Sequence, residues 1–548
     1  MMLFPAKFIA LLQKEAGPKK KKILFLGALS GVFEALSVVF INAAVVTTAT
    51  GNGADIQNLG LFLISILLYY YGDRWSTTQS LQTIGRFIYN TNVRIVDKVR
   101  RAGFKEFEEL ETTRVHSALT DNADIMIEAT RYLAEGISNV MMVAITAVYI
   151  ASVSAQAFFL VLFMDIVGLT VFVLSQNRLV QELTVVRNIR EGFIAAVNHV
   201  ILGFKEVKMS RARSDDLFEN YVRKLSDEAR ELKIATEVRV CNIFLNTRVF
   251  FIGLIASVVF ILPQFFTLDT VTITSVVAVV LFSFGPLMQV LLGIPFFAKA
   301  ELAVTTIEEL EARLDAMDDM RLTAPDPRIE GKVSFSRIEL EEVVFAYSEL
   351  EGKRSFALGP LTLTIPRNEL LMICGGNGSG KSTLLKLIAG LYYPQQGRMR
   401  LDDAVLTPGN YEHYRNLFST IYSDFHLFDR LYGQPDVDEE RLRQLLDTMS
   451  LSAHTAYVDG RFTNLKLSTG QRKRLALATS ILEDKPVLLF DEASSDLDPE
   501  FRRYFYETYL PELKAAGRTI VVVTHDDRFF HTADRLLRME YGQLVDRP

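Results

Sequence analysis

A glycine-rich loop in the second half of the chain has residue types that bind phosphate. Residues 375–382 read GGNGSGKS and lie between an apolar run and a helical run. Glycines let the backbone curl so that successive N–H groups and a helix N-terminus face an anion. At this spacing Lys381 is predicted to reach the β- and γ-phosphates of ATP, and Ser382 to hold Mg²⁺. The residues predicted to bind ATP are Gly375, Asn377, Gly378, Ser379, Gly380, Lys381, Ser382 and Thr383.

Two adjacent carboxylates follow a second apolar run. Residues 487–492 read VLLFDE, which is typical of a buried strand that ends in acidic residues. Asp491 is placed to complete a Mg²⁺ shell, and Glu492 to polarise an attacking water. A strand that ends in a solvated acidic turn is the alternative, and the phosphate loop argues against it.

Three further segments carry a family resemblance. They are LSTGQRKRLAL at 467–477, SDLD at 495–498 and TIVVVTHDD at 519–527. Together with the phosphate loop and the acidic pair, and in this order, they resemble the cassette of ATP-binding-cassette (ABC) proteins. The resemblance implies that ATP and Mg²⁺ are the cofactors and that the chain is an ATP hydrolase.

The resemblance also implies roles for single residues. Two copies of the chain would sandwich two ATP molecules, so that the signature of one copy faces the phosphates held by the other. The signature residues are Ser468, Thr469, Gly470 and Gln471. Glu492 would act as general base, His525 would contact the γ-phosphate, and Asp498 would belong to the D-loop. Tyr347, in VVFAY, stands where the family stacks an aromatic ring on adenine, although an ordinary strand aromatic is the alternative.

The segment IYSDFHLFD departs from the family pattern. It aligns with the loop that usually supplies a Gln to Mg²⁺ and the attacking water, and Ser423 stands at that position. A serine side chain is shorter, so its contact would need a bridging water or a shifted backbone. Asp424 is the alternative donor to the Mg²⁺ shell. Because the other catalytic residues are present, we predict an active ATPase.

Composition indicates a membrane protein. Of the 548 residues, 49% are hydrophobic, and a net charge of -6 gives no reason to expect a nucleic-acid partner. The two cysteines, Cys241 and Cys374, are too few for a disulfide framework and are predicted to be small buried hydrophobes. A transmembrane helix needs about 20 apolar residues. Six runs qualify, at about 23–47, 57–75, 134–154, 157–177, 243–263 and 271–297, and the second is the weakest.

Loop charges predict the orientation of these spans. The connections 48–56, 155–156 and 264–270 contain no Lys or Arg, whereas basic residues are frequent in 74–135 and 176–242. By the positive-inside rule both termini and the long loops are cytoplasmic. The long loops have helical character, and by the family resemblance their tips near 110–120 and 203–214 would dock onto the cassettes.

The predicted fold class is therefore a polytopic α-helical membrane domain of the exporter type, followed by an α/β P-loop nucleotide-binding domain. The membrane domain would occupy residues 1–320, a proline-containing linker 321–332 and the cassette 333–548. Six spans followed by one cassette is the layout of an ABC half-exporter.

Two carboxylates inside the predicted spans are candidates for a substrate cavity. Glu34 belongs to the first span and Asp165 to the fourth. Ionisable residues in a membrane are costly and usually face a cavity or a partner group. A cavity with both would suit a substrate that carries amine, guanidine or amide groups. Hydrogen bonding between helices without substrate contact is the alternative.

LSTGQRKR and THDDRFFHTADRLLRME resemble the bacterial exporters of cyclic peptides and peptide siderophores, including the pyoverdine-type exporters. This resemblance implies ATP-driven export of a siderophore precursor or cyclic lipopeptide across the bacterial inner membrane by a homodimer. Membrane lipids are expected partners, and an accessory protein of the envelope is a candidate partner. A lipid or lipopeptide flippase and a nucleotide-gated channel or receptor are the alternatives.

Overall fold

A computed structural model describes residues 5–49, 56–108, 110, 115, 118–317, 329, 334–347 and 356–545, except for the side chains of 49, 121, 175–184, 186–188, 190 and 191. The chain divides into two compact units. The first unit contains Met1–Val96 and Thr112–Ala312, and the second contains Asp97–Glu111 and Arg313–Pro548. A short piece of the long loop after the second span therefore belongs with the cassette.

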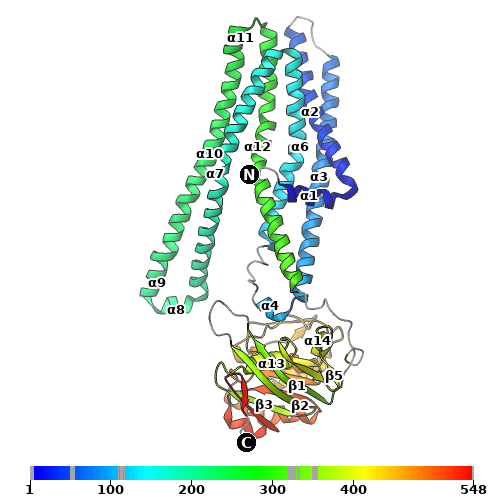
Figure 1. Ribbon diagram of the computed structural model, residues 1–548, viewed down its shortest axis with the longest axis vertical. Helices are drawn as coiled ribbons and strands as arrows, with labels where there is room; N and C mark the ends of the chain where they lie inside the picture. The colour runs from blue at the N-terminus through cyan, green and yellow to red at the C-terminus, as the bar shows by residue number, and fades with distance from the viewer. Residues whose placement is uncertain are drawn as a thin grey trace. The chain divides into compact units, whose positions relative to one another are not determined.

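The first unit is built from long helices (Figure 1). They are α2 (Lys20–Ala49), α3 (Ile56–Arg101), α6 (Asp121–Val153), α7 (Ala155–Leu202), α10 (Lys224–Ala256) and α12 (Thr270–Ala316). α10 continues through the π-helical turn η3 (Ser257–Ile261) into α11 (Leu262–Phe265). Each predicted span falls within one of these helices or its continuation, except that the third span, 134–154, extends one residue beyond the end of α6.

Hydropathy separates α3 from the other long helices. Within the described residues, five helical segments are long and apolar enough to cross a membrane, namely Ala6–Thr48, Asn122–Val153, Ala155–Leu174, Arg211–Phe265 and Thr270–Ala316. α3 is not among these segments, because the polar residues Asp73 and Arg74 follow its short apolar run closely. Leu63 and Leu67 on this run are 52% and 55% exposed, as expected for side chains that face lipid.

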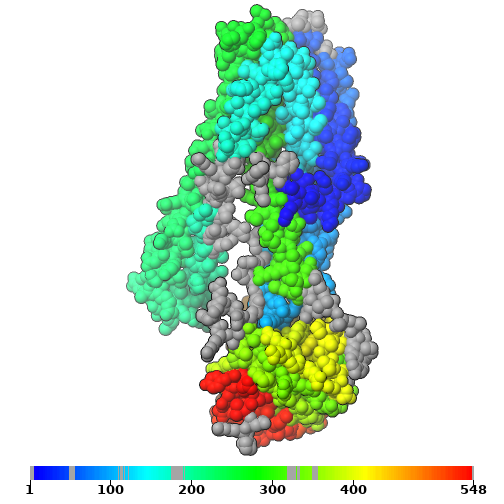
Figure 2. Space-filling view, viewed as in Figure 1, coloured from blue at the N-terminus to red at the C-terminus, as the bar shows by residue number. Residues whose placement is uncertain are grey.

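A helix that the sequence did not predict precedes the first span. α1 (Ala6–Ala16) joins α2 through the short helix η1 (Gly17–Lys19) and lies across neighbouring helices rather than along them (Figure 1). The Glu301 carboxylate of α12 accepts from the backbone N–H groups of Lys7 and Phe8, at 3.1 and 3.0 Å. A carboxylate at a helix N-terminus is favourable. This contact and the buried Phe8 ring hold α1 on the outside of the helical unit (Figure 2).

The helices of the two long loops continue well beyond the apolar runs, as the sequence predicts. α7 and α10 pack against each other and are joined by α8 (Phe204–Met209), α9 (Arg211–Asp216) and the π-helical η2 (Leu217–Arg223). After the last predicted span, α12 runs unbroken to Ala316. Cys241 on α10 is exposed and Cys374 in the cassette is only partly buried, which corrects the expectation that both are buried.

The second unit contains two sheets and a short hairpin. The first sheet is antiparallel, in the order β2-β1-β4-β5, with β1 (Arg337–Ala346), β2 (Ala357–Pro366), β4 (Gln396–Leu401) and β5 (Ala404–Val405). The second has the order β12-β11-β3-β10-β9-β6, with β3 (Leu370–Gly375), β6 (Phe418–Ile421), β9 (Val487–Asp491), β10 (Thr519–Val523), β11 (Arg535–Glu540) and β12 (Gln543–Val545). All its pairs are parallel except β11 with β12. The hairpin is β7 (Tyr457–Val458) with β8 (Arg461–Phe462).

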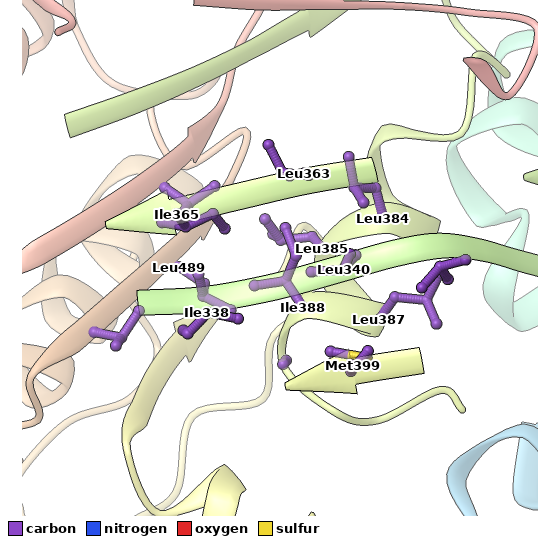
Figure 3. Packing of buried hydrophobic residues seen from close by; sticks show 14 of the residues in the cluster. Ile338, Leu340, Leu363, Ile365, Leu384, Leu385, Leu387, Ile388, Met399 and Leu489 are labelled. Carbon is purple, nitrogen blue, oxygen red and sulfur yellow. The ribbon is translucent and has the colours of Figure 1, made fainter. Parts of the chain in front are cut away.

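Helices cover both faces of the parallel sheet. α13 (Lys381–Ile388) contributes Leu384, Leu385, Leu387 and Ile388 to a core shared with β1, β2, β4 and β9 (Figure 3). A second core packs against α15 (Glu439–Thr448), α16 (Thr469–Leu482), α17 (Pro499–Tyr504), η5 (Phe505–Tyr509) and α18 (Leu510–Ala515). The remaining short helices are η4 (Pro408–Asn410), α14 (Tyr411–Arg415) and η6 (Asp527–Thr532). These two cores fix the strands whose ends carry the predicted site.

Candidate nucleotide-binding and hydrolysis site

Three neighbouring parallel strands end at the same edge of the larger sheet. Val523 of β10 pairs with Ile373 of β3 on one side and with Asp491 of β9 on the other. The loops that follow these strands therefore start side by side, which is where ligands bind in open α/β sheets. The phosphate loop, the acidic pair and His525 follow β3, β9 and β10 respectively.

The phosphate loop needs its glycines. Gly378 and Gly380 have φ values of 74° and 101°, a region that residues with a side chain rarely adopt. A Cβ on Gly380 would lie 2.6 Å from the Phe356 ring. The ammonium of Lys381, at the start of α13, donates to the carbonyl oxygens of Gly375 and Gly376 at 3.1 and 2.9 Å. The loop thus holds the ammonium at the helix N-terminus where the phosphates are predicted to bind.

Ser382 and Asp491 fit a Mg²⁺ ion. Asp491 is 2% exposed, and its Oδ1 has no hydrogen-bond partner among the described residues. Burial raises the pKa of this carboxyl above its ordinary value of 3.8, while the neighbouring Ser382 hydroxyl opposes the shift. A hydroxyl and a carboxylate are hard oxygen donors, and Mg²⁺ is commonly held by one or two such groups together with phosphates and water. A bound Mg²⁺ would supply charge neutralisation on the phosphates.

Glu492 and His525 form a pair. His525 Nε2 lies 3.0 Å from Glu492 Oε1, and both side chains are partly exposed. Glu492 has a φ of 51°, which is unusual for a residue with a side chain. Its backbone N–H donates to the Val523 carbonyl at 3.0 Å, which helps hold this conformation. The carboxylate is thereby directed away from the buried strand, as a group that activates water must be.

Ser423 and Asp424 lie in an exposed turn directly after β6. Ile421 of β6 pairs with Phe490 of β9, so the turn begins beside the acidic pair. Tyr422, which the sequence did not single out, has a buried hydroxyl. Burial raises the pKa of Tyr422, the neighbouring Thr420 hydroxyl opposes this shift, and the nearby carboxylates of Asp491 and Asp424 add to it. The turn is thus close to the predicted Mg²⁺ ligands.

The signature residues begin α16. The Ser468 hydroxyl accepts from the Gln471 backbone N–H at 3.3 Å, and the Gln471 side chain accepts from the Ser468 backbone N–H at 3.0 Å. This capping box leaves an exposed helix N-terminus, which is favourable for an anion. Gly470 is required because a Cβ there would lie 2.7 Å from the Asp496 carbonyl oxygen.

A buried lysine that the sequence reasoning missed joins the signature helix to the acidic pair. Lys473 is 4% exposed and donates to the Glu492 carbonyl at 2.9 Å, to the Ser495 hydroxyl and to the Asp496 carboxylate at 2.8 Å. The only feature of the sequence that pointed to Lys473 is that it lies within the signature segment LSTGQRKRLAL. Asp498, predicted in the D-loop, caps α17 by accepting from Phe501 N–H at 2.9 Å. Lys473 thus connects the signature helix to the turn that follows Glu492.

Tyr347 lies beside the phosphate loop. Its hydroxyl is 3.1 Å from the Thr383 hydroxyl and 3.4 Å from the Tyr392 hydroxyl, and the residue is 37% exposed. Tyr392 stacks on Phe345 with ring centroids 4.4 Å apart. The partly exposed ring of Tyr347 is thus held near the loop, as an adenine-stacking residue requires.

A short helix from the first long loop contacts Tyr392. α4 (Phe104–Glu108) belongs to the second unit. Its Glu108 carboxylate accepts from Tyr392 and forms an ion pair with Lys386 at 2.7 Å. The loop tip was predicted near 110–120, so the contact falls slightly earlier in the chain; residues 109, 111–114, 116 and 117 lie outside the described residues. The role of the second tip, near 203–214, stays a prediction.

The comparisons with known proteins identify the family of the chain. The ABC transporter family matches residues 358–495. Over 546 residues the chain is 30% identical to ATP-binding protein SyrD of Pseudomonas syringae pv. syringae, covering 95% of this chain and 93% of that protein. It also has the fold of a bacterial Atm1-family ABC exporter solved with ATP bound, with a TM-score of 0.72, 17% identity and coverage of 96% and 95% of the two chains. The chain therefore belongs to the ABC transporter family, and it is an exporter-type half-transporter that couples ATP hydrolysis to transport.

Shorter likenesses extend to transporters with different cargo. The chain is 34% identical over 235 residues to an ATP-dependent lipid A-core flippase of Chromohalobacter salexigens, which covers 40% of this chain and 38% of that protein. It is 32% identical over 269 residues to the mycobactin import ATP-binding/permease protein IrtB of Mycolicibacterium smegmatis, covering 46% and 45%. These likenesses leave the transported substrate open.

The buried Asp491 carboxyl should lower the stability of the metal-free protein. Because its pKa is raised in the folded state, protonation favours folding, and this stabilisation is lost as the pH rises from 3.8 through the raised value. In EDTA at neutral pH, Asp491→Asn should therefore raise the melting temperature of the full chain measured by calorimetry. The same variant should lose Mg²⁺-dependent ATP hydrolysis. Asp424→Asn replaces an exposed carboxylate and is the control, which should leave the melting temperature unchanged. Equal changes in the melting temperature of the two variants would contradict the claim that the buried Asp491 carboxylate destabilises the metal-free protein.

Ser423→Gln should restore the longer side chain that the family usually carries. We expect the ratio of ATP hydrolysed to substrate moved to change, while the ATP affinity stays within about twofold, because the turn lies beside the acidic pair and not on the phosphate loop. Both rates can be measured in proteoliposomes. Unchanged hydrolysis and transport in this variant would remove any special role for the serine.

Glu108→Gln should weaken the link between α4 and the cassette. The charged bonds to Tyr392 and Lys386 are lost, so substrate-stimulated hydrolysis should fall several-fold while the basal rate is retained. Glu106→Gln, on the exposed side of the same helix, is the matched control. If both variants retain full stimulation, α4 does not transmit substrate binding through Glu108.

Proposed function

We propose that the chain exports a peptide-derived small molecule, such as a siderophore precursor or cyclic lipopeptide, across the bacterial inner membrane. The observation that carries the proposal is the fusion, on one chain, of an assembled hydrolysis site with a helical unit of exporter fold. The likeness to SyrD extends over 95% of the chain and so includes both units. The narrower substrate class is supported by the resemblance of LSTGQRKR to exporters of cyclic peptides and peptide siderophores.

The working form that we propose is a homodimer. Half-transporters of this family generally function as dimers, and one chain carries one phosphate loop and one signature. The tip around α8 exposes Leu202, Phe204 and Met209 at 85%, 60% and 87%. Apolar side chains at such a polar tip suit a protein partner. A second copy, whose cassette receives this tip, fits that surface.

The proposed substrate carries basic or amide groups. Glu34 on α2 is half-buried near Asp73 on α3, and Asp73 in turn lies near Glu135 on α6, which also has Arg131 close to it. Carboxylates within a membrane are costly unless positive or hydrogen-bonding groups meet them. A peptide amine or guanidine would meet that need. Asp165 lies half-buried on α7 and, within the described residues, is not part of this group, so Glu34 is the stronger of the two candidates.

A lipid or lipopeptide flippase is the second candidate, because some relatives bear that name. A nucleotide-gated channel or receptor is less well supported. A gate needs nucleotide binding more than continuous turnover, whereas Glu492 and His525 are paired as a hydrolytic site requires. Alternating access driven by ATP closure of the cassettes and reset by hydrolysis is the mechanism that we propose.

The proposal predicts a trapped metabolite. In a strain that lacks the protein, a peptide-type metabolite or its precursor should accumulate inside the cells, as measured by mass spectrometry of cell extracts and medium. The parent chain should restore release. Glu492→Gln should not restore it, because loss of a general base slows hydrolysis by about 10²-fold or more while ATP binding is kept.

Other outcomes would contradict this assignment. Unchanged metabolites with altered lipid asymmetry would favour the flippase, and full rescue by Glu492→Gln would favour a hydrolysis-independent gate. Once the metabolite is known, the stimulation of ATP hydrolysis by this metabolite should be weaker in the Glu34→Gln variant than in the Asp165→Asn variant. Equal stimulation in both variants and the parent would exclude Glu34 from substrate binding.

A further inference from the structure

A groove runs along the outer side of α2 and α3 and has no part in the hydrolysis site. It encloses about 580 Å³ and is mostly apolar along its length. Two of its lining residues, Leu68 and Tyr71, are 44% and 64% exposed, so the groove opens on the surface that faces lipid. Its apolar lining includes Leu26, Leu29, Phe33 and Leu68.

Close packing of α2 and α3 determines which of their residues lie side by side at the groove. The Ser76 hydroxyl on α3 donates to the Ile23 carbonyl on α2 at 3.1 Å. One turn deeper, a Cβ on Gly72 would lie 3.2 Å from the Ser30 side chain. Small residues thus bring the backbones together. This register places Lys22, at the cytoplasmic end of the first span, beside Trp75 near the end of the second.

Cations gather at this end of the groove. Lys22 Nζ lies 4.7 Å from the centre of the Trp75 ring, and Arg74 Nη1 donates to the Tyr70 hydroxyl at 3.0 Å. Neither Lys22 nor Arg74 has an ion-pair partner in the described part of the chain. Lys19 approaches the same end, since its Nζ donates at 3.2 Å to Gln79, another lining residue.

This arrangement matches the chemistry of an anionic phospholipid. Tryptophan, tyrosine and basic side chains concentrate at the membrane interface, and a basic cluster beside a transmembrane helix attracts anionic lipids of the cytoplasmic leaflet. We propose that the groove binds one such lipid, with its phosphate between Lys22 and Arg74 and an acyl chain along the apolar lining. The lipid is a bound component of the transporter, and the inference does not depend on which substrate is exported.

The chain provides its own probe for this lipid, because Trp75 is its one tryptophan. The full chain is reconstituted in phosphatidylcholine vesicles that contain a minority of phosphatidylglycerol, with bromine on the acyl chains of either one lipid or the other. Brominated phosphatidylglycerol should quench Trp75 fluorescence more strongly than its mole fraction in the vesicles predicts. Lys22→Gln and Arg74→Gln should each lower the relative affinity for phosphatidylglycerol by about fivefold.

Lys21→Gln is the matched control. Lys21 is exposed at the neighbouring position of α2 but does not line the groove. Lys21→Gln therefore reduces the surface charge by the same amount as Lys22→Gln. The Lys21→Gln variant should keep the preference for phosphatidylglycerol. An equal loss in Lys21→Gln and Lys22→Gln would show general attraction to a charged surface and overturn the site. Quenching in the parent in proportion to lipid content would overturn it as well.

Discussion

Parallel pairing of β3, β10 and β9 is the constraint on which the rest of the molecule depends. The pairs Val523–Ile373 and Val523–Asp491 bring three loops, far apart in sequence, to one edge of a buried sheet. The apolar strands are held from both faces by helices, so the loops have fixed starting points. Phosphate binding, metal binding and activation of water can then be provided by Lys381, Ser382, Asp491 and Glu492 without any long-range movement. The energy needed to bury Asp491 is a cost that bound Mg²⁺ would offset.

Two sets of contacts connect this edge to the rest of the chain. Lys473 ties the signature helix to the turn that carries Glu492, the predicted general base, through the Glu492 backbone carbonyl and the Asp496 carboxylate. On the other side, Tyr392 connects Glu108 of α4 with Tyr347 beside the phosphate loop. A chain of polar contacts therefore runs from α4 to the residue beside the phosphate loop. A network of this kind has the connectivity that coupling of hydrolysis to transport requires.

The parts of the fold and site that the sequence revealed are those encoded by local spacing. The phosphate loop, the acidic pair and the apolar spans each occupy one short segment. The loop follows β3 and begins α13, the acidic pair lies at the end of β9, and among the described residues five of the six predicted spans correspond to helices that are long and apolar enough to cross a membrane. The missed residues depend on contacts between distant segments. Glu108 and Tyr392 are separated by 284 positions, and Glu301 caps a helix 293 positions away, so no local pattern could pair them. The extent of α12 was also missed, because its charged end follows the apolar span without a breaking residue. Cys241 is exposed although Thr236 and Ile243 of the same helix are buried, so it lies on a face of α10 that is turned away from the neighbouring helices.

The division of each ATP site between two chains can be tested by complementation. Lys381→Ala removes the phosphate-binding ammonium, and Ser468→Arg blocks the signature, so each variant alone should be inactive as a homodimer. When the two variants are assembled together with different affinity tags, and the mixed pair is isolated, one site should contain both intact Lys381 and intact Ser468. We predict that the mixed pair regains ATP hydrolysis. A mixed pair that remains inactive, while a parent pair isolated in the same way hydrolyses ATP, would contradict a site completed by the second chain.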